Sequence, residues 1–294
     1  MQKKELRQIL VTDQGEYAES LQQWDLTIAP SKGWVPLNLG ELKAYHELLY
    51  FLIWRNIKIR YKQTVLGAAW AVIQPFFTMV VFSIFFGRLA HISSGNVPYP
   101  IFAYTALVPW TFFANTLTQA SNSLLENERM LTKIYFPRVL LPTAAVLSGL
   151  LDFLIAFIIL IGMMIWYHMV PTVNIWLVPF FVLMATLTAL GVSLWLSALN
   201  VQYRDVRYVI PFLVQFWLFS TPIAYPSSLV PAKWQALYGL NPMAGVVDGF
   251  RWALLGNPPG SMQLIFVSFI VVVVVLISGL YYFRRMEETF ADVV

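Results

Sequence analysis

Long apolar runs separated by short polar segments make up most of the chain from residue 65 onward. A helix of about 20 apolar residues crosses the hydrocarbon core of a bilayer, and runs of about this length recur along the sequence. The pattern predicts an all-α integral membrane fold with six transmembrane helices per chain, in one transmembrane domain over residues 64–283. The predicted spans are residues 65–87, 101–123, 139–167, 175–199, 208–224 and 262–283.

The segment before the first span has a different helical pattern. Its apolar residues recur at three- and four-residue spacing, and basic residues crowd its end from Arg55 to Lys62. A helix with an apolar face and a basic edge suits the plane of the membrane surface. We predict an amphipathic interface helix over residues 41–63; the alternative is a helix packed within the cytoplasmic part. Residues 1–40 are polar, lack a secretory signal pattern and are expected to form a cytoplasmic N-terminal segment.

The stretch between the fifth and sixth spans is apolar but rich in proline and glycine. It is too short and too interrupted for two further spans, so we predict a re-entrant helical hairpin over residues 225–256 on the outer side. Its non-helical backbone must be shielded by protein or line a cavity, because lipid offers no hydrogen-bond partners. Asp248 and Arg251 lie three residues apart on the expected helix and are placed to pair. An apolar stripe on that helix comprises Met243, Val246, Val247, Phe250 and Leu254.

Composition supports a membrane protein and excludes several chemistries. Of the 294 residues, 59% are hydrophobic and only 12% are charged, about half the charged share of a typical soluble domain. There is no cysteine, which excludes disulfides, thiolate metal sites and cysteine nucleophiles. The three histidines are far apart and show no metal-ligand spacing, so no metal site is expected. The net charge of +4 is modest and indicates membrane topology rather than nucleic-acid binding.

The basic residues predict the orientation of the chain. Lys and Arg near spans are enriched on the cytoplasmic side. With a cytoplasmic N-terminus, six spans leave only Arg88, Lys233 and Arg251 on the outer side. Both termini are therefore expected in the cytoplasm of a bacterial cell, with residues 284–294 as a tail. The basic residues then on the inner side are Arg55, Lys58, Arg60, Lys62, Arg129, Lys133, Arg138, Arg204, Arg207, Arg284 and Arg285.

No catalytic or nucleotide-binding motif is present in the sequence. The chain has no GxxxxGK[ST] loop, no HExxH and no GxSxG. It is therefore not expected to be an enzyme, and ATP-driven transport would need an ATPase on another polypeptide.

Asp152 is the one charged residue well inside a predicted span. An intramembrane carboxylate is a candidate functional group, because exposing it to lipid costs several kcal/mol. The alternative interpretation is structural, with the carboxyl group bonded to a neighbouring helix or to a dimer partner.

The loop between the second and third spans, residues 126–138, mixes charged and apolar residues. A short helix with a polar and an apolar face is predicted there as a docking element for a soluble partner; the alternative is an ordinary solvated loop. Its candidate coupling residues are Glu126, Glu128, Arg129 and Lys133.

Aromatic residues make up 16% of the chain. Tyr and Trp at span ends are typical interfacial anchors, but clusters within the first and fifth spans need another account. Packing against lipid is one interpretation, and a lining that stacks on sugar faces is the other. The candidate lining residues are Phe76, Phe82 and Phe86 in the first span and Phe212, Phe216 and Phe219 in the fifth.

Six ordered blocks resemble the type-2 ABC exporter permeases of polysaccharides, a family that includes O-antigen, capsule and teichoic-acid exporters. The resemblance covers roughly residues 34–285 and is specific for the family. The blocks are RYKQTVLGAAWAVIQP (60–75), VPYPIFAYTALVPWTFFAN (97–115), NERMLTKIYFPRVLLP (127–142), LNVQYRDVRYVIPFLVQ (199–215), TPIAYP (221–226) and LNPMAGVVDGFRWALLG (240–256).

This resemblance implies a permease homodimer that binds two ATP-binding subunits, with ATP and Mg²⁺ held by those subunits and no cofactor on this chain. The implied substrate is a glycan linked to undecaprenyl diphosphate, with O-antigen as the expected glycan. Residues 126–137 are implied to be the coupling helix, spans one and five to line the channel, and residues 225–256 to sit at its outer mouth.

Two other functions remain open from the residues alone. A proton-coupled secondary carrier typically has several intramembrane ionisable groups and often internal repeats, whereas this chain has one such group and no clear repeat. A membrane-embedded glycosyl-transfer enzyme needs charged residues gathered on outer loops. The large outer segment offers only Lys233, Asp248 and Arg251.

Overall fold

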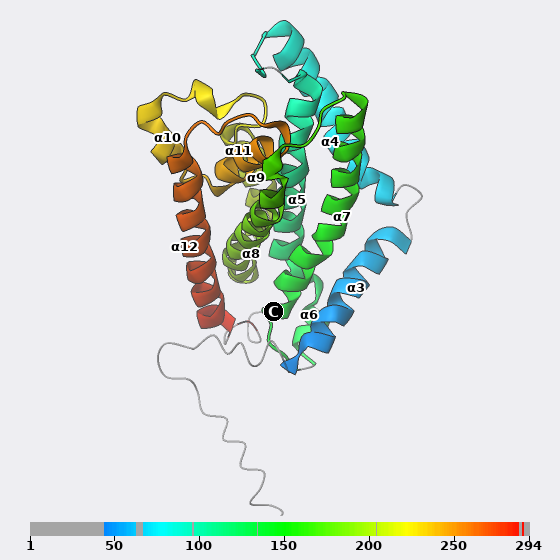
Figure 1. Cartoon of the computed structure of the whole chain (residues 1–294). Helices are drawn as coiled ribbons and strands as arrows, with labels where there is room; N and C mark the ends of the chain where they lie inside the picture. Colours follow the sequence, from blue (N-terminus) through cyan, green and yellow to red (C-terminus); the bar gives the residue numbers. More distant parts are fainter. Residues whose placement is uncertain are drawn as a thin grey trace, which may run out of the picture. The chain divides into compact units, whose positions relative to one another are not determined.

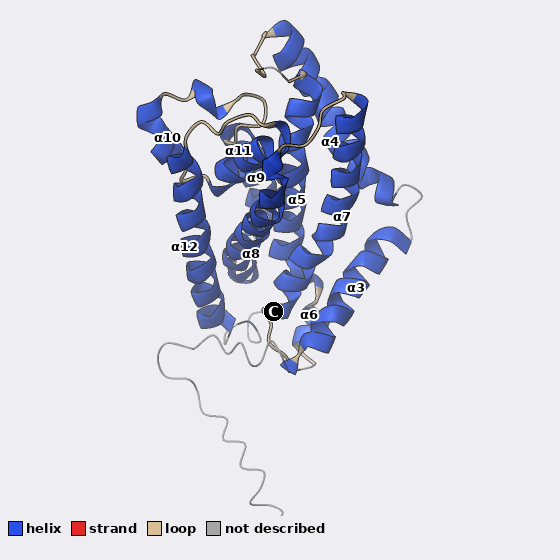
Figure 2. Cartoon of the chain, in the orientation of Figure 1, coloured by secondary structure: helices blue, strands red, loops and turns tan. Residues whose placement is uncertain are grey.

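The computed structural model describes residues 44–62, 67–95, 97–133, 135–203, 205–287 and residue 290. Within these residues the fold is helical and contains no strand (Figure 2), which confirms the predicted all-α class. The predicted N-terminal segment, residues 1–40, lies outside the described residues. So do residues 288–289 and 291–294 of the predicted tail.

Helices follow one another through the described part of the chain with short connections (Figure 1). Three of the shorter elements depart from α-helical winding. The element η1 is a π-helical continuation of α4, η2 is a 3₁₀ turn that leads into α8, and η3 is a 3₁₀ turn after α9. The elements are α3 His46–Lys62, α4 Gly67–Phe82, η1 Ser83–Leu89, α5 Tyr99–Glu126, α6 Glu128–Leu131, α7 Leu140–Trp166, η2 Val173–Leu177, α8 Val178–Gln202, α9 Val206–Ser220, η3 Ser227–Leu229, α10 Ala232–Tyr238, α11 Pro242–Leu255 and α12 Met262–Glu287.

Four helical stretches of the described residues are long and apolar enough to cross a membrane. They are Ala69–Leu89, Leu140–Trp166, Val173–Gln202 and Met262–Glu287, and they coincide with the predicted first, third, fourth and sixth spans. The helix at the predicted fifth span, α9, is apolar but shorter. The protein is therefore a multi-pass membrane protein.

The helix α5, at the predicted second span, is as long as these four but less apolar. It is the most deeply packed long helix, in contact with α4, α7, α8 and α11, and most of its side chains are buried. Its buried Thr105, Thr111 and Thr116 donate hydrogen bonds to carbonyl oxygens of their own helix, three or four residues earlier. Protein contacts thus surround these three threonines of α5.

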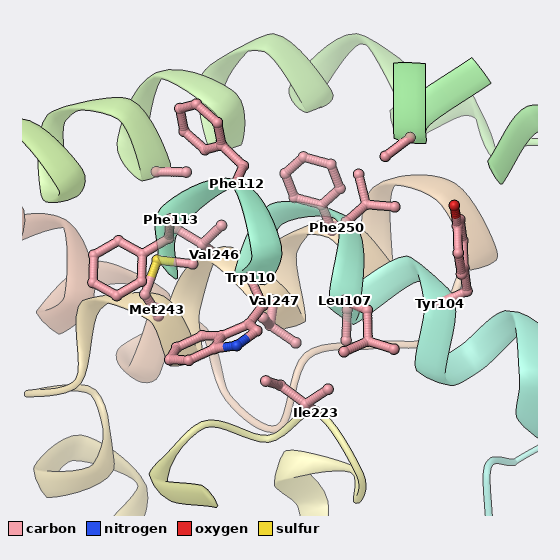
Figure 3. Close-up of a cluster of buried hydrophobic side chains, with 14 of the residues drawn as sticks. Tyr104, Leu107, Trp110, Phe112, Phe113, Ile223, Met243, Val246, Val247 and Phe250 are labelled. Atoms are coloured by element: carbon pink, nitrogen blue, oxygen red, sulfur yellow. The ribbon is translucent and has the colours of Figure 1, made fainter. Parts of the chain in front are cut away.

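The short helix α11 is buried on all sides. The predicted apolar stripe from Met243 to Leu254 is fully buried, and Figure 3 shows Met243, Val246, Val247 and Phe250 facing the α5 side chains Trp110, Phe112 and Phe113. On another face of α11, Gly249 allows close packing against Phe181. A Cβ atom at this position would lie 2.1 Å from a ring carbon of Phe181. Complete burial of α11 was not predicted; the stripe identified only one of its faces.

Asn241 fixes the start of α11. Its side-chain oxygen accepts hydrogen bonds from the backbone N–H of Met243 at 3.0 Å and from the indole of Trp217 at 2.8 Å. Its amide nitrogen donates to the carbonyl oxygen of Ser220 at 3.0 Å. One N-cap residue therefore links the end of α9 to α11. The segment predicted as a hairpin, residues 225–256, contains the two helices α10 and α11 together with η3.

The expected pairing of Asp248 with Arg251 is wrong, because the two side chains bind different partners. The Arg251 guanidinium donates to the carbonyl oxygens of Pro222 at 2.5 Å, Ile223 at 2.7 Å and Tyr225 at 3.3 Å. Its Nε atom donates to the Phe102 carbonyl oxygen at 3.3 Å, and the guanidinium carbon lies 3.5 Å from the centre of the Phe102 ring.

The carbonyl groups that Arg251 binds belong to a turn after α9, residues 222–225. The fourth carbonyl group of this turn and the Asp248 carboxylate accept hydrogen bonds from other residues. The Tyr99 hydroxyl donates to the Ala224 carbonyl oxygen at 2.6 Å. The Asp248 carboxylate accepts from the Ser227 hydroxyl and from the Gly260 backbone N–H. Four consecutive carbonyl groups after α9, residues 222–225, therefore all receive donors from Arg251 or Tyr99.

Alanine substitutions at Gly249 and at Gly162 should change the stability of the protein in opposite directions. Gly249→Ala forces a Cβ atom into the buried Phe181 ring, and overpacking costs about 1–3 kcal/mol. Gly162 lies within α7, and no atom lies within 4 Å of the place that an added methyl group would take. Gly162→Ala should therefore stabilise by up to about 1 kcal/mol through helix propensity. Thermal unfolding in detergent measures both; shifts of the same sign and size would contradict the tight α11 packing.

Candidate functional site

Asp152, on α7, lies against the end of α3, the helix predicted to lie at the membrane interface. Its carboxylate forms an ion pair with the Arg60 guanidinium and accepts a hydrogen bond from the Tyr61 hydroxyl. Arg60 also donates to the side-chain oxygen of Gln119 on α5. The ionised side chains are mostly shielded, with 21% of Arg60 and 17% of Asp152 exposed. This network joins α3, α5 and α7, and it gives Asp152 the neighbouring-helix partner that the structural interpretation requires.

The protonation of Tyr61 follows from the same contact. Burial raises the pKa of the Tyr61 hydroxyl, and the hydrogen bond to the Asp152 carboxylate raises this pKa further. Tyr61 therefore stays protonated and acts as the donor. The arrangement holds a carboxylate in place; it offers neither a nucleophile nor a second carboxyl group with which Asp152 could exchange a proton.

The predicted docking segment is helical over a shorter range than expected. Residue Glu126 is the last residue of α5, and α6 covers only Glu128–Leu131. Asn127 separates the two helices, since its side-chain amide donates back to the Ser123 carbonyl oxygen at 2.7 Å. Lys133 lies in the following turn. The expected helix over residues 126–137 is therefore divided: its first residue ends α5, α6 forms one short turn, and residues 132–133 and 135–137 are not helical.

The short helix α6 does have the two faces that were predicted. Leu131 is buried in a cluster with Leu124 and Phe136, whereas Glu128 and Arg129 are exposed. The charged side chains are thus presented outward from a turn whose apolar side is anchored in the protein.

The aromatic candidates of the first span have different surroundings. Phe76 is exposed. Phe82 is buried, and its ring meets the Phe86 ring edge to face at 5.3 Å between centroids. Both rings belong to or pack against the main hydrophobic core of the described residues. Of these three residues, Phe76 is exposed, Phe86 is partly buried and Phe82 is buried.

The three aromatic candidates of α9 lie together. Phe212, Phe216 and Phe219 are between 61% and 70% exposed, and their spacing of four and three residues places them on one helix face. The opposite side of α9 packs inward, since Trp217 meets the Phe113 ring of α5 at 5.0 Å between centroids. Within this chain, α9 thus has an outward aromatic face and an anchored inner face.

Sequence reasoning found Asp152 but missed Arg60 as its partner. Ninety-two positions separate the two residues, and only the packing of α3 on α7 brings them together. No group of three or more His, Cys, Asp or Glu side chains that could hold a metal ion occurs among the residues with described positions.

Comparison with known proteins gives the family of the chain. Residues 47–255 match the family described as ABC-2 type transporter, which is well over half of the chain. The protein belongs to the ABC-2 type transporter family. The match begins within α3 and ends with α11, so it includes Arg60, Asp152 and the buried Arg251 of this ABC-2 chain.

This ABC-2 member spans nearly the whole length of several relatives that are named as export or transport proteins of glycans. The chain is 27% identical over 257 residues to the O-antigen export system permease protein RfbA of Klebsiella pneumoniae, with 87% of this chain and 97% of that protein covered. It is 28% identical over 255 residues to the RfbA permease of Myxococcus xanthus, with 86% and 97% covered. It is 24% identical over 243 residues to the polysialic acid transport protein KpsM of Escherichia coli, with 81% and 92% covered.

The Asp152 network predicts a difference between two substitutions. Asp152→Asn keeps an acceptor for Arg60 or Tyr61 and should retain most stability and transport. Asp152→Leu removes the acceptor for both donors and should destabilise by about 1–3 kcal/mol. Thermal unfolding in detergent measures the stability change. Adding Arg60→Gln to Asp152→Leu should recover part of it. Loss of transport in Asp152→Asn at normal expression would instead assign Asp152 a charge-dependent role.

Proposed function

We propose that this chain is the permease subunit of an ATP-driven exporter that moves a lipid-linked polysaccharide, with O-antigen as the favoured glycan, across the bacterial cytoplasmic membrane. The observation that carries the proposal is the similarity to O-antigen export permeases over 97% of their length. The glycan would be carried on undecaprenyl diphosphate. The absence of a phosphate-binding loop from the sequence assigns ATP hydrolysis to a separate ATPase subunit.

Six spans are proposed for the membrane domain: α4 with η1, α5, α7, η2 with α8, α9, and α12. The buried polar residues of α5, such as Thr105, Thr111 and Thr116, support rather than oppose a crossing, because neighbouring helices surround them. The fifteen residues of α9 measure about 22 Å, and the turn bound by Arg251 extends this path. With both termini in the cytoplasm, α10 and α11 form the re-entrant hairpin on the outer side.

Cysteine labelling tests this topology in a chain that has no native cysteine. Single cysteines at Ser94 and Ser228 should react with a membrane-impermeant reagent in intact cells, and one at Asp205 should react only after permeabilisation. Ser228 and Asp205 are both exposed, so accessibility within the protein is matched. Outside labelling at Asp205 would overturn the six-span arrangement.

The functional assembly is proposed to be a permease homodimer with two ATPase subunits. The ABC-2 family supports an ATPase partner, and α6 supplies a suitable contact on the cytoplasmic side. Glu128 and Arg129 are exposed on α6 while Leu131 anchors it. Because this charged turn follows the end of α5, it can transmit a movement of the soluble subunit to α5, the most deeply packed long helix. Glu126 and Lys133 flank this turn and are proposed to assist.

Loss of this permease tests the proposed function directly. Deleting the gene should cause lipid-linked glycan to accumulate on the cytoplasmic side and should remove that glycan from the cell surface. Restoring the wild-type chain should reverse both effects. A chain with Glu128→Lys and Arg129→Glu should insert normally but co-purify poorly with the ATPase or fail to couple hydrolysis to export. Normal surface glycan in the deletion strain would refute the proposal.

The channel is proposed to run along α9 and the exposed face of α4. A sliding glycan needs weak contacts that are repeated along the path, and flat aromatic rings contact sugar faces without one fixed hydrogen-bond pattern. By analogy with polymer-binding grooves, each stacking contact contributes about 1–3 kcal/mol. The exposed Phe76, Phe212, Phe216 and Phe219 support such a lining. Phe82 and Phe86 are proposed to support α4 by packing.

Alanine substitutions separate the two aromatic classes. Phe212→Ala and Phe216→Ala should slow glycan export while expression and assembly with the ATPase remain normal, because these rings contribute little to packing in the chain. Phe82→Ala should instead lower stability by about 3–5 kcal/mol and reduce protein yield, as is typical of a buried phenylalanine. Export rates normalised to protein amount distinguish the outcomes. Normal export by Phe76, Phe212, Phe216 and Phe219 alanine variants would exclude an aromatic lining on these helices.

A further inference from the structure

A pocket of about 410 Å³ lies between α3, α5 and α7, beside the Asp152 network. Its volume falls in the range of small-molecule sites. One wall carries guanidinium and amide groups, and the other is made of small and aliphatic side chains. The lining residues are Leu52, Arg55, Asn56, Ile59, Arg60, Gln119, Ser123, Glu126, Asn127, Leu141, Ala144 and Ala145.

Arg55 has an unfilled donor in this pocket. Its terminal nitrogen Nη2 donates to the Asn127 side-chain oxygen at 2.7 Å and lies 3.5 Å from the Asn56 oxygen. Its Nε atom is buried and has no hydrogen-bond partner among the described residues. A buried donor without an acceptor is destabilising, so an oxygen ligand from outside the described residues would stabilise this nitrogen.

The other charges of the pocket are compatible with an anion. Arg60 supplies a second guanidinium group, although Asp152 from outside the lining offsets its charge. Glu126 is the one carboxylate among the lining residues. Arg55 is therefore the group best placed to bind a phosphate, through the forked geometry that guanidinium groups offer.

The position of α3 indicates where the anion would come from. Tyr50, Phe51 and Trp54 are exposed on this helix, and Lys58 lies above the Trp54 ring at 6.0 Å. Exposed aromatic and basic side chains on an amphipathic helix are typical of the membrane surface. Figure 1 shows α3 beside α7, at the end of the helices near α6. A pocket under this helix is within reach of lipid headgroups, and its aliphatic wall suits the adjoining glycerol or acyl segment.

We propose that this pocket binds the phosphate headgroup of a membrane lipid, with Arg55 as the main ligand. The proposal needs only a membrane protein and does not depend on glycan export. Two sources share this chemistry: a glycerophospholipid and the diphosphate of a lipid-linked substrate. Binding by either would hold α3 against α5 and α7.

Native mass spectrometry of the purified full-length chain tests lipid retention. The probes are phosphatidylglycerol and a glucosyl diacylglycerol of the same acyl chains, which has no phosphate. Phosphatidylglycerol should be retained preferentially. Arg55→Gln should lower its retention by about tenfold, the loss expected for one charge-assisted hydrogen bond. Lys58→Gln removes the same charge from an exposed position of the same helix and should stay within about twofold of wild type.

A second pair of variants tests the pocket without altering a buried group. Ile59 lines the pocket yet is exposed, so substitution there leaves the core intact. Ile59→Glu places a negative charge at the opening and should lower phosphatidylglycerol retention about tenfold, whereas the neutral Ile59→Gln should not. Equal retention in Ile59→Glu and Ile59→Gln, or equal retention of the two lipids by wild type, would overturn the proposal.

Competition identifies the source of the phosphate. Displacement of phosphatidylglycerol from the wild type by farnesyl diphosphate supports the substrate lipid as occupant. Retention of phosphatidylglycerol against the diphosphate supports a glycerophospholipid. Weakened ATPase binding with unchanged lipid retention in Arg55→Gln would overturn the proposal and assign the pocket to the partner protein.

Discussion

The Arg251 guanidinium and the Tyr99 hydroxyl provide the interaction on which the packing of α9 and α11 depends. Between them they donate hydrogen bonds to the carbonyl groups of residues 222–225, where the chain leaves helical geometry. Non-helical backbone is tolerated at membrane depth only when protein satisfies its polar groups. Because Arg251 belongs to α11 and also binds Phe102 of α5, the same contact fixes α11 against the central helix and sets the end of α9.

The helices could be predicted because burial in lipid or protein demands long apolar runs. Residues 139–167 and 262–283 were placed almost to the ends of α7 and α12. The deep packing of α5 among other helices was not predicted, although its moderate polarity was a usable signal. Thr105 and Thr116 are compatible with protein neighbours and costly against lipid. The burial of α11 beyond its stripe also had a signal in Gly245 and Gly249, which permit close approach of Ser268 and Phe181.

Contacts between distant segments could not be predicted in the same way. A span that is apolar all round has no preferred face, so its sequence does not say which neighbour each side meets. For this reason Phe82 and Phe76 could not be separated into packed and exposed positions. Asp152 was recognised as unusual because a charge is rare in a span, but its partner Arg60 depends on how α3 crosses α7. The spacing of Asp248 and Arg251 suggested a local pair, whereas carbonyl groups elsewhere satisfy Arg251 better.

The Arg251 contact also has a consequence for the order of events during synthesis. Phe102 is made 149 residues before Arg251. At about 5–20 residues per second, this separation is roughly 7–30 s of translation. The Phe102 carbonyl group on α5 therefore stays without its Arg251 donor for that time. The carbonyl groups of Pro222, Ile223 and Tyr225 likewise lack theirs until α11 is made. A nascent chain that stops before Arg251 leaves three of the four carbonyl groups of this turn without their donors, so it should be less stable than a chain that includes Arg251.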